Sequence, residues 1–237
     1  MMSPGEVPPG GAQVIALIPV QGLPLYREKL GGRTLLAHTI QTAKASRAVQ
    51  RIIVSTEDDR MAELAKREGA EAPFLRPKEL ASSNVPLEKV LQHAVEWLEE
   101  SDGKPVEVVV LLEVTHPFRP PGLIDKIVET LFRENWDSVF VAHEERANFW
   151  YLQGGGLTRI SGPERGPRTL KSPLYREISG LVCATRGEII KRGERLGHRV
   201  GMVPIRDLSG LVDVRTQTDL EIAERLLPKW ESLCLPY

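Results

Sequence analysis

The stretch from Val106 to Arg119, VEVVVLLEVTHPFR, decides the fold. Residues 108–112 are apolar without interruption, which is typical of a strand buried on both faces of a parallel sheet. In open α/β sheets, ligands bind beyond the carboxyl ends of such strands. We therefore expect function at the polar residues that follow this strand. They are Glu113, Thr115, His116 and Arg119. The alternative is an ordinary strand-to-helix connection whose geometry is set by Pro117 and Pro120.

Strands and helices alternate on both sides of this stretch. The expected strands are Val14 to Pro19, Arg51 to Val54, Pro73 to Leu75, the run after Val106, Ser138 to Val141 and Val200 to Ile205. Helical spacing of apolar residues predicts helices over Thr34 to Ser46, Asp59 to Glu68, Pro86 to Glu100, Leu123 to Arg133, Gly187 to Arg195 and Gln217 to Leu227. This order predicts an α/β fold with a doubly wound, mostly parallel sheet.

Residues that cap helices mark two of these boundaries. Ser55 or Thr56 is expected to cap the helix that begins near Asp59. Thr216 and Asp219 have the spacing of a capping box before the last helix.

Length and composition favour one domain. The chain has 237 residues, 41% of them hydrophobic, which is enough to build a single core. We expect a disordered tail over residues 1–12, which are rich in Pro and Gly, and a single domain over 13–237. The stretch from Glu144 to Tyr175 has no helical period. It is expected to form a small β-rich arm through which two copies of the chain make a homodimer.

Charge and cysteine content exclude several functions. The formal net charge is -1, from 31 basic and 32 acidic residues, and gives no support to a nucleic-acid or membrane-surface role. No apolar stretch has the length of a membrane span. Cys183 and Cys234 are too few and too isolated for a disulfide framework or a metal site, which fits a reducing cytosol. We therefore expect a cytoplasmic protein with small-molecule partners.

Several segments resemble, in order, the cytidylyltransferases that activate acidic nine-carbon sugars, the acylneuraminate type. Gly69 to Ala81, GAEAPFLRPKELA, nearly matches the family's Gly-Ala-Glu-x-Pro-Phe-Leu-Arg-Pro-x-Glu-Leu-Ala, and Leu111 to Arg119 stands where the family has Leu-Leu-Gln-Pro-Thr-Ser-Pro-Leu-Arg. The other matching segments are LGGRTL (30–35), VSTED (54–58), NFWY (148–151), RTLKSPLYRE (168–177) and LVDVRTQTD (211–219). The resemblance extends from Val14 to Leu227 and implies a Rossmann-like nucleotide-diphospho-sugar transferase fold.

The resemblance also implies a reaction, in which CMP passes from CTP to an acidic, sialic-acid-like sugar and pyrophosphate is released. Such chemistry needs cationic groups for the phosphates and a divalent ion, and Asp213 is the implied Mg²⁺ ligand. The implied catalytic residues are Arg27, Lys29 and Asp213. The implied nucleotide contacts are Gln21, Gly22, Arg76 and Ser82. The implied substrate contacts are Glu113, Thr115, Arg119, Arg168, Tyr175 and Arg176.

Three features depart from the family's pattern. The loop from Val20 to Lys29 is several residues shorter and lacks the family's Gly-Gly pair and loop lysine. Arg215 stands at the second acid of the family's Asp-x-Asp, and Glu113 replaces a glutamine. Two alternatives therefore stay open. One is a non-catalytic homologue that binds a nucleotide or a protein partner, and the other is a nucleotidyltransferase with a different nucleotide or acceptor.

Overall fold

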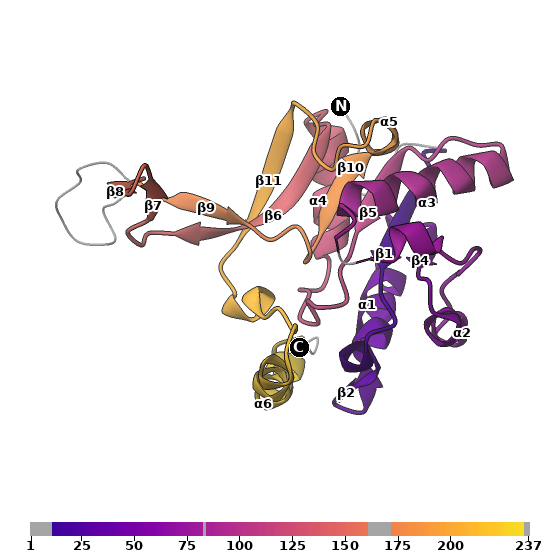
Figure 1. Ribbon diagram of the computed structural model, residues 1–237, viewed down its shortest axis with the longest axis horizontal. Coiled ribbons are helices and arrows are strands. Elements are labelled where there is room, and N and C mark those ends of the chain that lie inside the picture. The colour runs from indigo at the N-terminus through magenta and orange to yellow at the C-terminus, as the bar shows by residue number, and fades with distance from the viewer. Residues whose placement is uncertain (1–10, 83, 161–171, 235–237) are drawn as a thin grey trace.

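A mixed sheet with helices on both faces forms the centre of the computed structural model, which describes residues 11–82, 84–160 and 172–234 (Figure 1). Its strands are β1 (Val14–Pro19), β4 (Arg51–Ser55), β5 (Val108–Leu111), β6 (Ser138–Glu145), β9 (Leu174–Glu177), β10 (Cys183–Arg186) and β11 (Val200–Ile205). They lie in the order β11-β6-β10-β5-β1-β4, and β9 pairs with β6. β1, β4, β5, β6 and β11 run in one direction, and only β9 and β10 among the described strands of this sheet run in the other. The predicted mostly parallel α/β sheet is therefore confirmed.

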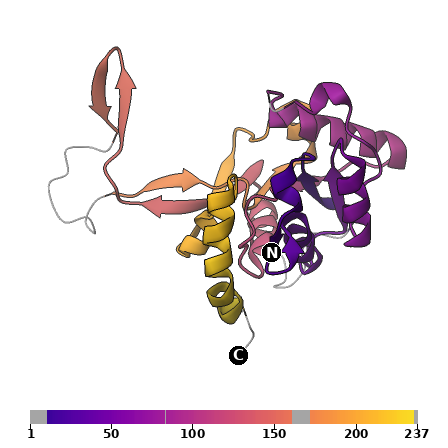
Figure 2. The same cartoon turned by 60° about the horizontal axis from the view of Figure 1, so that its bottom comes forward.

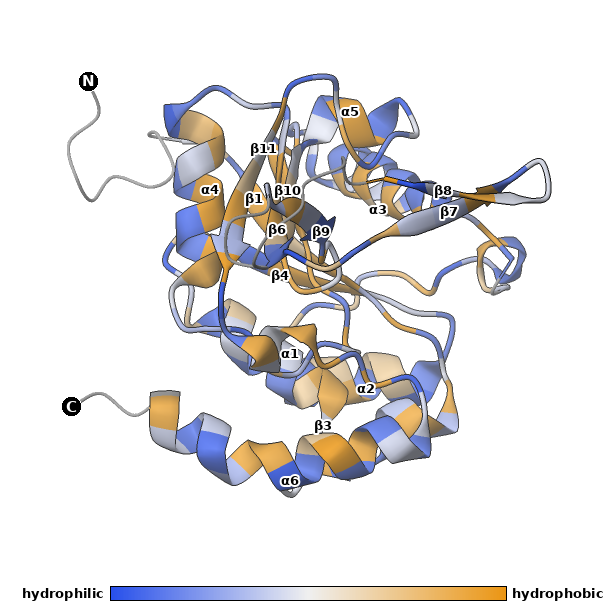
Figure 3. Cartoon of the chain, turned by 90° about the vertical axis from the view of Figure 1, so that its left-hand side faces the viewer, coloured by the Kyte–Doolittle hydropathy of each residue, from blue (hydrophilic) through white to orange (hydrophobic). Residues whose placement is uncertain are grey.

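Successive side chains of β1 point to opposite faces of the sheet, and helices cover both faces, so the sequence of β1 is apolar throughout. The helices are α1 (Leu35–Lys44), α2 (Asp59–Arg67), α3 (Leu87–Asp102), α4 (Leu123–Arg133), α5 (Gly187–Lys191) and α6 (Gln217–Cys234). Val14, Ala16 and Ile18 pack in one core cluster with apolar residues of α1, α4 and α6. Ile15 and Leu17 pack in a second cluster with residues of α3 and α5. Figure 3 shows the central strands enclosed between α4 on one side and α3 and α5 on the other.

Several elements lie where the sequence predicts them, and two local predictions are wrong. β1, α4 and β11 have the predicted bounds. Residues 73–75 do not form a strand, and the nearest ladder contact is a single parallel bridge between Ile53 and Glu71. Asp58 caps α2 by accepting a hydrogen bond from the Met61 N–H at 3.0 Å, because β4 continues through Ser55 and leaves no room for a cap there.

The carboxyl-terminal helices also differ from their expected lengths. α6 continues past Leu227 and includes Pro228, whereas α5 ends at Lys191. The predicted capping box before α6 is confirmed, since the Thr216 and Asp219 side chains each accept the other residue's backbone N–H. No helix in the described part of the chain is both long and apolar enough to cross a bilayer. Residues 1–10 of the predicted tail lie outside the described residues, and Ala12 is buried.

A β-rich arm extends from the sheet, as the sequence predicts. β6 and β9 form an antiparallel pair that leads away from the core. β7 (Trp150–Gln153) and β8 (Gly156–Arg159) form a hairpin beyond them, and Figure 2 shows this hairpin projecting from the body. Residues 161–171, which include the implied substrate contact Arg168, lie outside the described residues.

Residues 178–182, here named the 178–182 loop, separate β9 from β10 although both strands pair with β6. Val141 of β6 stays bonded to both ends of the loop, accepting from the Ile178 N–H at 2.7 Å and donating to the Val182 carbonyl at 3.2 Å. The loop lies at the carboxyl end of β5 because β10 runs against β5, and there the Gly180 carbonyl accepts the Glu113 N–H at 2.9 Å.

Candidate active site

Two cavities meet at the carboxyl ends of β1 and β5. The first, named the β1–β5 cavity, has a volume of about 300 Å³ and lies between the loops that follow these two strands and the start of α3. The second, named the β5–β9 cavity, has a volume of about 230 Å³ and lies between the end of β5, the start of the 178–182 loop and residues 211–215. Glu113 and Arg215 line both cavities. The sheet edge predicted for function therefore carries the candidate site.

The β1–β5 cavity combines one apolar wall with polar groups. The apolar wall consists of Leu80, Val85, Leu87 and Val90. The polar lining includes Gln21, Tyr26, Arg76, Ser82 and Thr115. The Gln21 amide donates to the Ala81 carbonyl at 2.9 Å and so joins the loop after β1 to the segment before α3. An apolar wall with a few directed polar groups suits a flat ring with a polar edge.

Arg76 is 5% exposed and holds the loop after β1. Its Nη2 donates to the Val20 carbonyl at 3.0 Å and to the Glu57 carboxylate, while its Nε has no hydrogen-bond partner among the described residues. Glu57 also accepts the Gly22 N–H at 2.9 Å. Burial raises the pKa of Glu57, but the hydrogen bonds from Arg76 and Gly22 outweigh it, and the net pKa is lowered.

The cationic residues expected in this loop do not reach the cavities. Arg27 folds back on the loop, where its Nη2 contacts Asp58 Oδ2 at 2.5 Å and the Gly22 carbonyl at 3.1 Å. Lys29 is exposed in β2 (Lys29–Leu30), which pairs with β3 (Arg33–Thr34). Neither side chain lines the two cavities.

Tyr26, for which the sequence motifs predict no role, lines the β1–β5 cavity instead. The 3-10 helix η1 (Pro24–Arg27) places Tyr26 on the cavity wall, and burial raises the pKa of its hydroxyl. The position of Tyr26, an aromatic residue directly before Arg27 in the predicted phosphate-binding loop, is the sequence feature that could have indicated a role at the cavity. At Gly22, a Cβ would lie 2.4 Å from Asp58 Oδ2, so this position has no room for a side chain.

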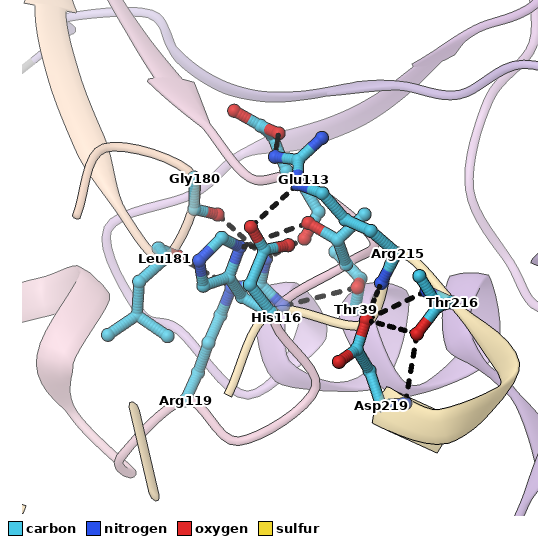
Figure 4. Close-up of polar contacts among 11 residues, drawn as sticks. Thr39, Glu113, His116, Arg119, Gly180, Leu181, Arg215, Thr216 and Asp219 are labelled. Carbon is cyan, nitrogen blue, oxygen red and sulfur yellow. Dashed lines mark hydrogen bonds and ion pairs between the residues drawn. The ribbon is translucent and has the colours of Figure 1, made fainter. Parts of the chain in front are cut away.

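Glu113 and Arg215 occupy the junction of the two cavities. Oε2 of Glu113 lies 3.5 Å from Nη2 of Arg215, and Arg215 Nε donates to Asp213 Oδ2 at 2.6 Å (Figure 4). Asp219 at the start of α6 accepts the backbone N–H of Arg215 at 3.0 Å. Burial raises the pKa of Glu113, and the Arg215 charge offsets part of that effect. The junction is therefore a fixed cation between two carboxylates.

His116 lines the β5–β9 cavity as a neutral imidazole. Its side chain is 8% exposed, and its Nδ1 lies 3.1 Å from Thr115 Oγ1 and 4.0 Å from Asp213 Oδ1. Burial and the nearby Arg119 charge lower the pKa of His116 to about 4. Gly180 packs against the ring so closely that a Cβ there would lie 2.7 Å from His116 Cε1.

Arg119 lies behind the cavities rather than in the predicted substrate contact. Its Nε donates to the Leu181 carbonyl at 2.6 Å and its Nη1 to Thr39 Oγ1 at 3.1 Å. Its Nη2 donates to the Gly180 carbonyl at 3.1 Å and to the Glu113 carbonyl (Figure 4). Burial lowers the pKa of Arg119 to about 9. These bonds occupy all three guanidinium nitrogens and tie the 178–182 loop to the end of β5.

Adjacent residues of β9 point in opposite directions and so separate two predicted substrate contacts. Arg176 lines the β5–β9 cavity, with its Nε 3.5 Å from Glu145 Oε1. Tyr175 is 42% exposed, pairs with Glu144 and does not line that cavity. Side chains alternate between the faces of a strand, so only one of the pair can face the cavity.

The residues at Asp213 do not build a resident metal site. Oδ2 of Asp213 is bonded to Arg215, while Oδ1 is buried without a hydrogen-bond partner among the described residues. One free carboxylate oxygen beside a guanidinium is a poor match for Mg²⁺, which needs several oxygen ligands. No group of three or more His, Cys, Asp or Glu side chains suited to a metal occurs in the described part of the chain. Asp213 and its neighbours therefore do not fit a protein-held Mg²⁺ ion.

The sheet order and the two cavities at its carboxyl edge define an α/β protein that binds ligands beyond its strand ends. The sequence model described as cytidylyltransferase matches residues 27–150, which is more than half of the chain. The chain therefore belongs to the cytidylyltransferase family of enzymes, and the resemblance stated from its motifs is confirmed.

Relatives and solved structures agree with this family. The chain is 26% identical over 226 residues to the CMP-N,N'-diacetyllegionaminic acid synthase of Legionella pneumophila, covering 91% of this chain and 96% of that protein. It is 24% identical over 203 residues to the post-translational flagellin modification protein B of Campylobacter coli, covering 84% and 86%. Its fold is similar to the CMP:2-keto-3-deoxy-manno-octonic acid synthetase solved in complex with CTP, with a TM-score of 0.69, 14% identity and coverage of 92% and 99%.

Proposed function

We propose that this protein transfers CMP from CTP to an acidic, sialic-acid-like nonulosonate and releases pyrophosphate. The observation that carries the proposal is the meeting of two cavities at Glu113 and Arg215. A transferase must hold two substrates with their reacting atoms side by side, and two joined cavities meet that requirement. The relatives' names support the donor and the acceptor class. We place this chemistry in the cytoplasm, with small-molecule partners and without a nucleic acid or a membrane.

The β1–β5 cavity takes the nucleotide in this proposal. Its apolar wall is suited to one face of a cytosine, and Gln21, Ser82 and Thr115 offer hydrogen bonds to the base and the ribose. The unpartnered Nε of Arg76 is a buried donor that lacks an acceptor until a ligand supplies one. Arg27 contacts the outer phosphates once it leaves Asp58.

The β5–β9 cavity takes the acceptor. Arg176 supplies a guanidinium that pairs with the acceptor's carboxylate in a bidentate manner. His116 is neutral near pH 7 and offers a hydrogen bond to a hydroxyl group. Glu113 stands at the junction and accepts the proton of the attacking hydroxyl, a task for which a carboxylate with a raised pKa is suited.

The arm supports a homodimer. Large apolar side chains are exposed on the hairpin, with exposed fractions of 55% for Trp150, 73% for Leu152 and 69% for Leu157. Soluble monomers rarely leave such a group of apolar side chains in water, and a second copy of the chain is the usual partner.

A different acceptor is the second candidate, and Glu113 is the observation that favours it. A carboxylate facing the β5–β9 cavity repels an acidic sugar, and an acceptor with a hydroxyl or amine at that point avoids this cost. In this case the same cavities and the same nucleotide would serve an uncharged acceptor.

Calorimetric titration and pyrophosphate release test the proposal together. CTP is titrated into the protein with ATP, GTP and UTP as comparators, and each nucleotide is supplied as its magnesium complex. We expect binding selective for CTP, followed by pyrophosphate release with an acidic nonulosonate and none with neutral hexoses. Release with neutral acceptors alone favours the second candidate. Binding of CTP without release with any acceptor indicates a non-catalytic homologue, and the absence of any nucleotide binding contradicts the proposal.

A further inference from the structure

We propose that Arg215 is a catalytic residue whose guanidinium contacts the α-phosphate of the bound nucleotide, at the position where the family pattern has a second acid. This inference rests on the proposed function, because it assigns a role within the same transfer reaction. It identifies the source of positive charge at a site whose residues do not fit a resident metal.

Arg215 lies at the junction of the two cavities. The α-phosphorus joins the nucleotide to the acceptor in the transition state, so it must lie where the two cavities meet. Glu113 and Arg215 are the residues shared by the two cavities in the described part of the chain. Glu113 repels a phosphate and Arg215 attracts it, so Arg215 is the phosphate-binding member of the pair.

Two hydrogen bonds to aspartates fix the orientation of Arg215. Asp213 holds Nε at 2.6 Å, and Asp219 holds the backbone N–H at 3.0 Å. Nη2 lies 3.5 Å from Glu113, and neither terminal nitrogen makes a hydrogen bond within the described residues. The side chain is 59% exposed and lines both cavities, so a ligand in either cavity can reach it. A guanidinium fixed through Nε, whose terminal nitrogens make no hydrogen bond within the described residues and whose Nη2 has only the 3.5 Å ion pair with Glu113, presents a fork that fits two phosphate oxygens.

The chemistry of the transfer gives this cation a task. The acceptor's hydroxyl oxygen forms a bond to the α-phosphorus while the bond from that phosphorus to the bridging α–β oxygen breaks. Pyrophosphate leaves with the electron pair of that bond, and the hydroxyl proton passes to Glu113. Charge on the equatorial oxygens changes during this step, and a preoriented cation stabilises it without having to reorganise. Arg215 therefore acts on the transition state more than on the bound nucleotide.

Two variants at position 215, together with chemical rescue, test the inference. Arg215→Ala is expected to lower kcat by about 100-fold while the CTP dissociation constant changes by less than about fivefold. Arg215→Lys keeps the charge without the fork and is expected to fall between the alanine variant and the unmodified protein. Added guanidinium ion is expected to restore part of the activity of Arg215→Ala and to leave the unmodified protein unchanged. Arg133→Ala is the matched control, because Arg133 lies on an exposed face of α4 and its side chain is 56% exposed.

A binding measurement provides a readout independent of turnover. Arg215→Asp recreates two carboxylates around position 214, and Mn²⁺ binding without nucleotide can be followed by the electron paramagnetic resonance signal of free Mn²⁺. We expect the Arg215→Asp variant to bind Mn²⁺ at least about tenfold more tightly than the unmodified protein. Equally tight binding by the unmodified protein overturns the inference, since Asp213 would then hold a metal beside Arg215.

The outcomes separate this inference from the function on which it rests. Turnover by the unmodified protein with an unchanged kcat in a folded Arg215→Ala variant overturns the role of Arg215 and leaves the transferase in place. If Arg215→Ala does not fold, the kcat of Arg215→Gln decides, because glutamine also lacks the charge, and an unchanged value has the same meaning. Absence of CTP binding and of turnover in the unmodified protein contradicts both proposals.

Discussion

Gly180 lies against His116 with no space for a side chain between them, since a Cβ at Gly180 would lie 2.7 Å from His116 Cε1 and 3.0 Å from the Glu113 carboxyl carbon. The 178–182 loop and the end of β5 therefore form one packed wall of the β5–β9 cavity. A change at one side of this contact must move the other.

The substitution Gly180→Ala is expected to destabilise the fold by about 1 to 3 kcal/mol, because the added methyl group overpacks a buried contact. The KM for the acceptor should rise, while CTP binding should stay within about twofold. Thermal unfolding and steady-state kinetics measure both effects. Gly156→Ala is the control, since the nearest atom to its Cβ lies at 3.9 Å. An unchanged acceptor KM in a destabilised variant would show that the wall does not shape the acceptor site.

The substitution Arg119→Lys should lower the free energy of unfolding by about 3 kcal/mol or more. A lysine cannot reach the three carbonyl groups and the Thr39 hydroxyl that accept hydrogen bonds from Arg119. Urea unfolding measures this loss. Arg133→Lys on the exposed face of α4 should change stability by less than about 0.5 kcal/mol. Similar losses in the two variants would contradict the role of Arg119 in tying the 178–182 loop to the end of β5.

The lowered pKa of His116 predicts a loss of stability in acid. The native state keeps His116 neutral to a pKa of about 4, whereas an unfolded histidine titrates near 6.5, so the unfolded state binds more protons in between. The contribution of His116 to the free energy of unfolding is therefore fully present above about pH 6.5. It falls by about 3 kcal/mol as the pH drops to about 4. The raised pKa of Glu113 acts with the opposite sign.

Chemical unfolding at pH 7 and pH 4.5 measures the contribution of His116. Between these pH values, the free energy of unfolding of the unmodified protein should fall by about 2 to 3 kcal/mol more than that of the His116→Gln variant. The difference isolates His116, because Glu113 is present in both proteins. Equal losses would indicate that the native imidazole is already charged at pH 7 or exposed to water.

The substitution Glu113→Gln separates the two candidate acceptors. If Glu113 accepts the hydroxyl proton, kcat should fall by about 100-fold, and the rise of kcat with pH through the raised pKa of Glu113 should disappear. The KM for an acidic sugar should not rise, since a repelling charge is removed. Glu129→Gln on the exposed side of α4 is the control. A kcat that increases with acidic sugars would favour the uncharged acceptor as the natural one.

Charges placed on the arm should change the assembly. Leu152 and Leu157 pair across the hairpin, so Leu152→Asp together with Leu157→Asp puts two carboxylates in the middle of the exposed apolar group. Light scattering after size-exclusion chromatography should give the mass of a dimer for the unmodified protein and of one chain for the double variant. Thr158→Asp on the neighbouring register position is the control. A monomeric unmodified protein would contradict the homodimer.

The sequence predicted the parts of the fold that hydrophobic patterns determine. β1, α4 and β11 have strong apolar patterns, and their bounds were predicted to the residue. Pro73 to Leu75 looked like a strand but has no ladder of hydrogen bonds, because pairing depends on distant residues that a local pattern does not contain. Helix ends were less certain, since a cap depends on where the preceding strand stops.

The site was predicted in place but only partly in its residues. The strand end after Leu112, Gln21, Arg76 and Ser82 meet at the cavities, as expected. Arg119 was assigned to the substrate, yet a buried guanidinium surrounded by carbonyl groups can be recognised only from tertiary contacts. Tyr26 and Arg215 gained their positions from a short 3-10 helix and from the cap of α6. The sequence pattern gives no direction for these side chains.

The 178–182 loop forms a wall of the β5–β9 cavity between two strands that pair with the same neighbour, β6. Because β10 runs against β5, the chain enters the catalytic edge before this strand and leaves it at the opposite end. The flanking bonds to Val141 close the ladder around the loop. A change of length between Ile178 and Val182 would therefore reshape this wall of the β5–β9 cavity, whereas the pairs with β6 on either side hold the register of β9 and β10. Arg186 lies at the amino end of β5, at the edge of the sheet opposite the two cavities.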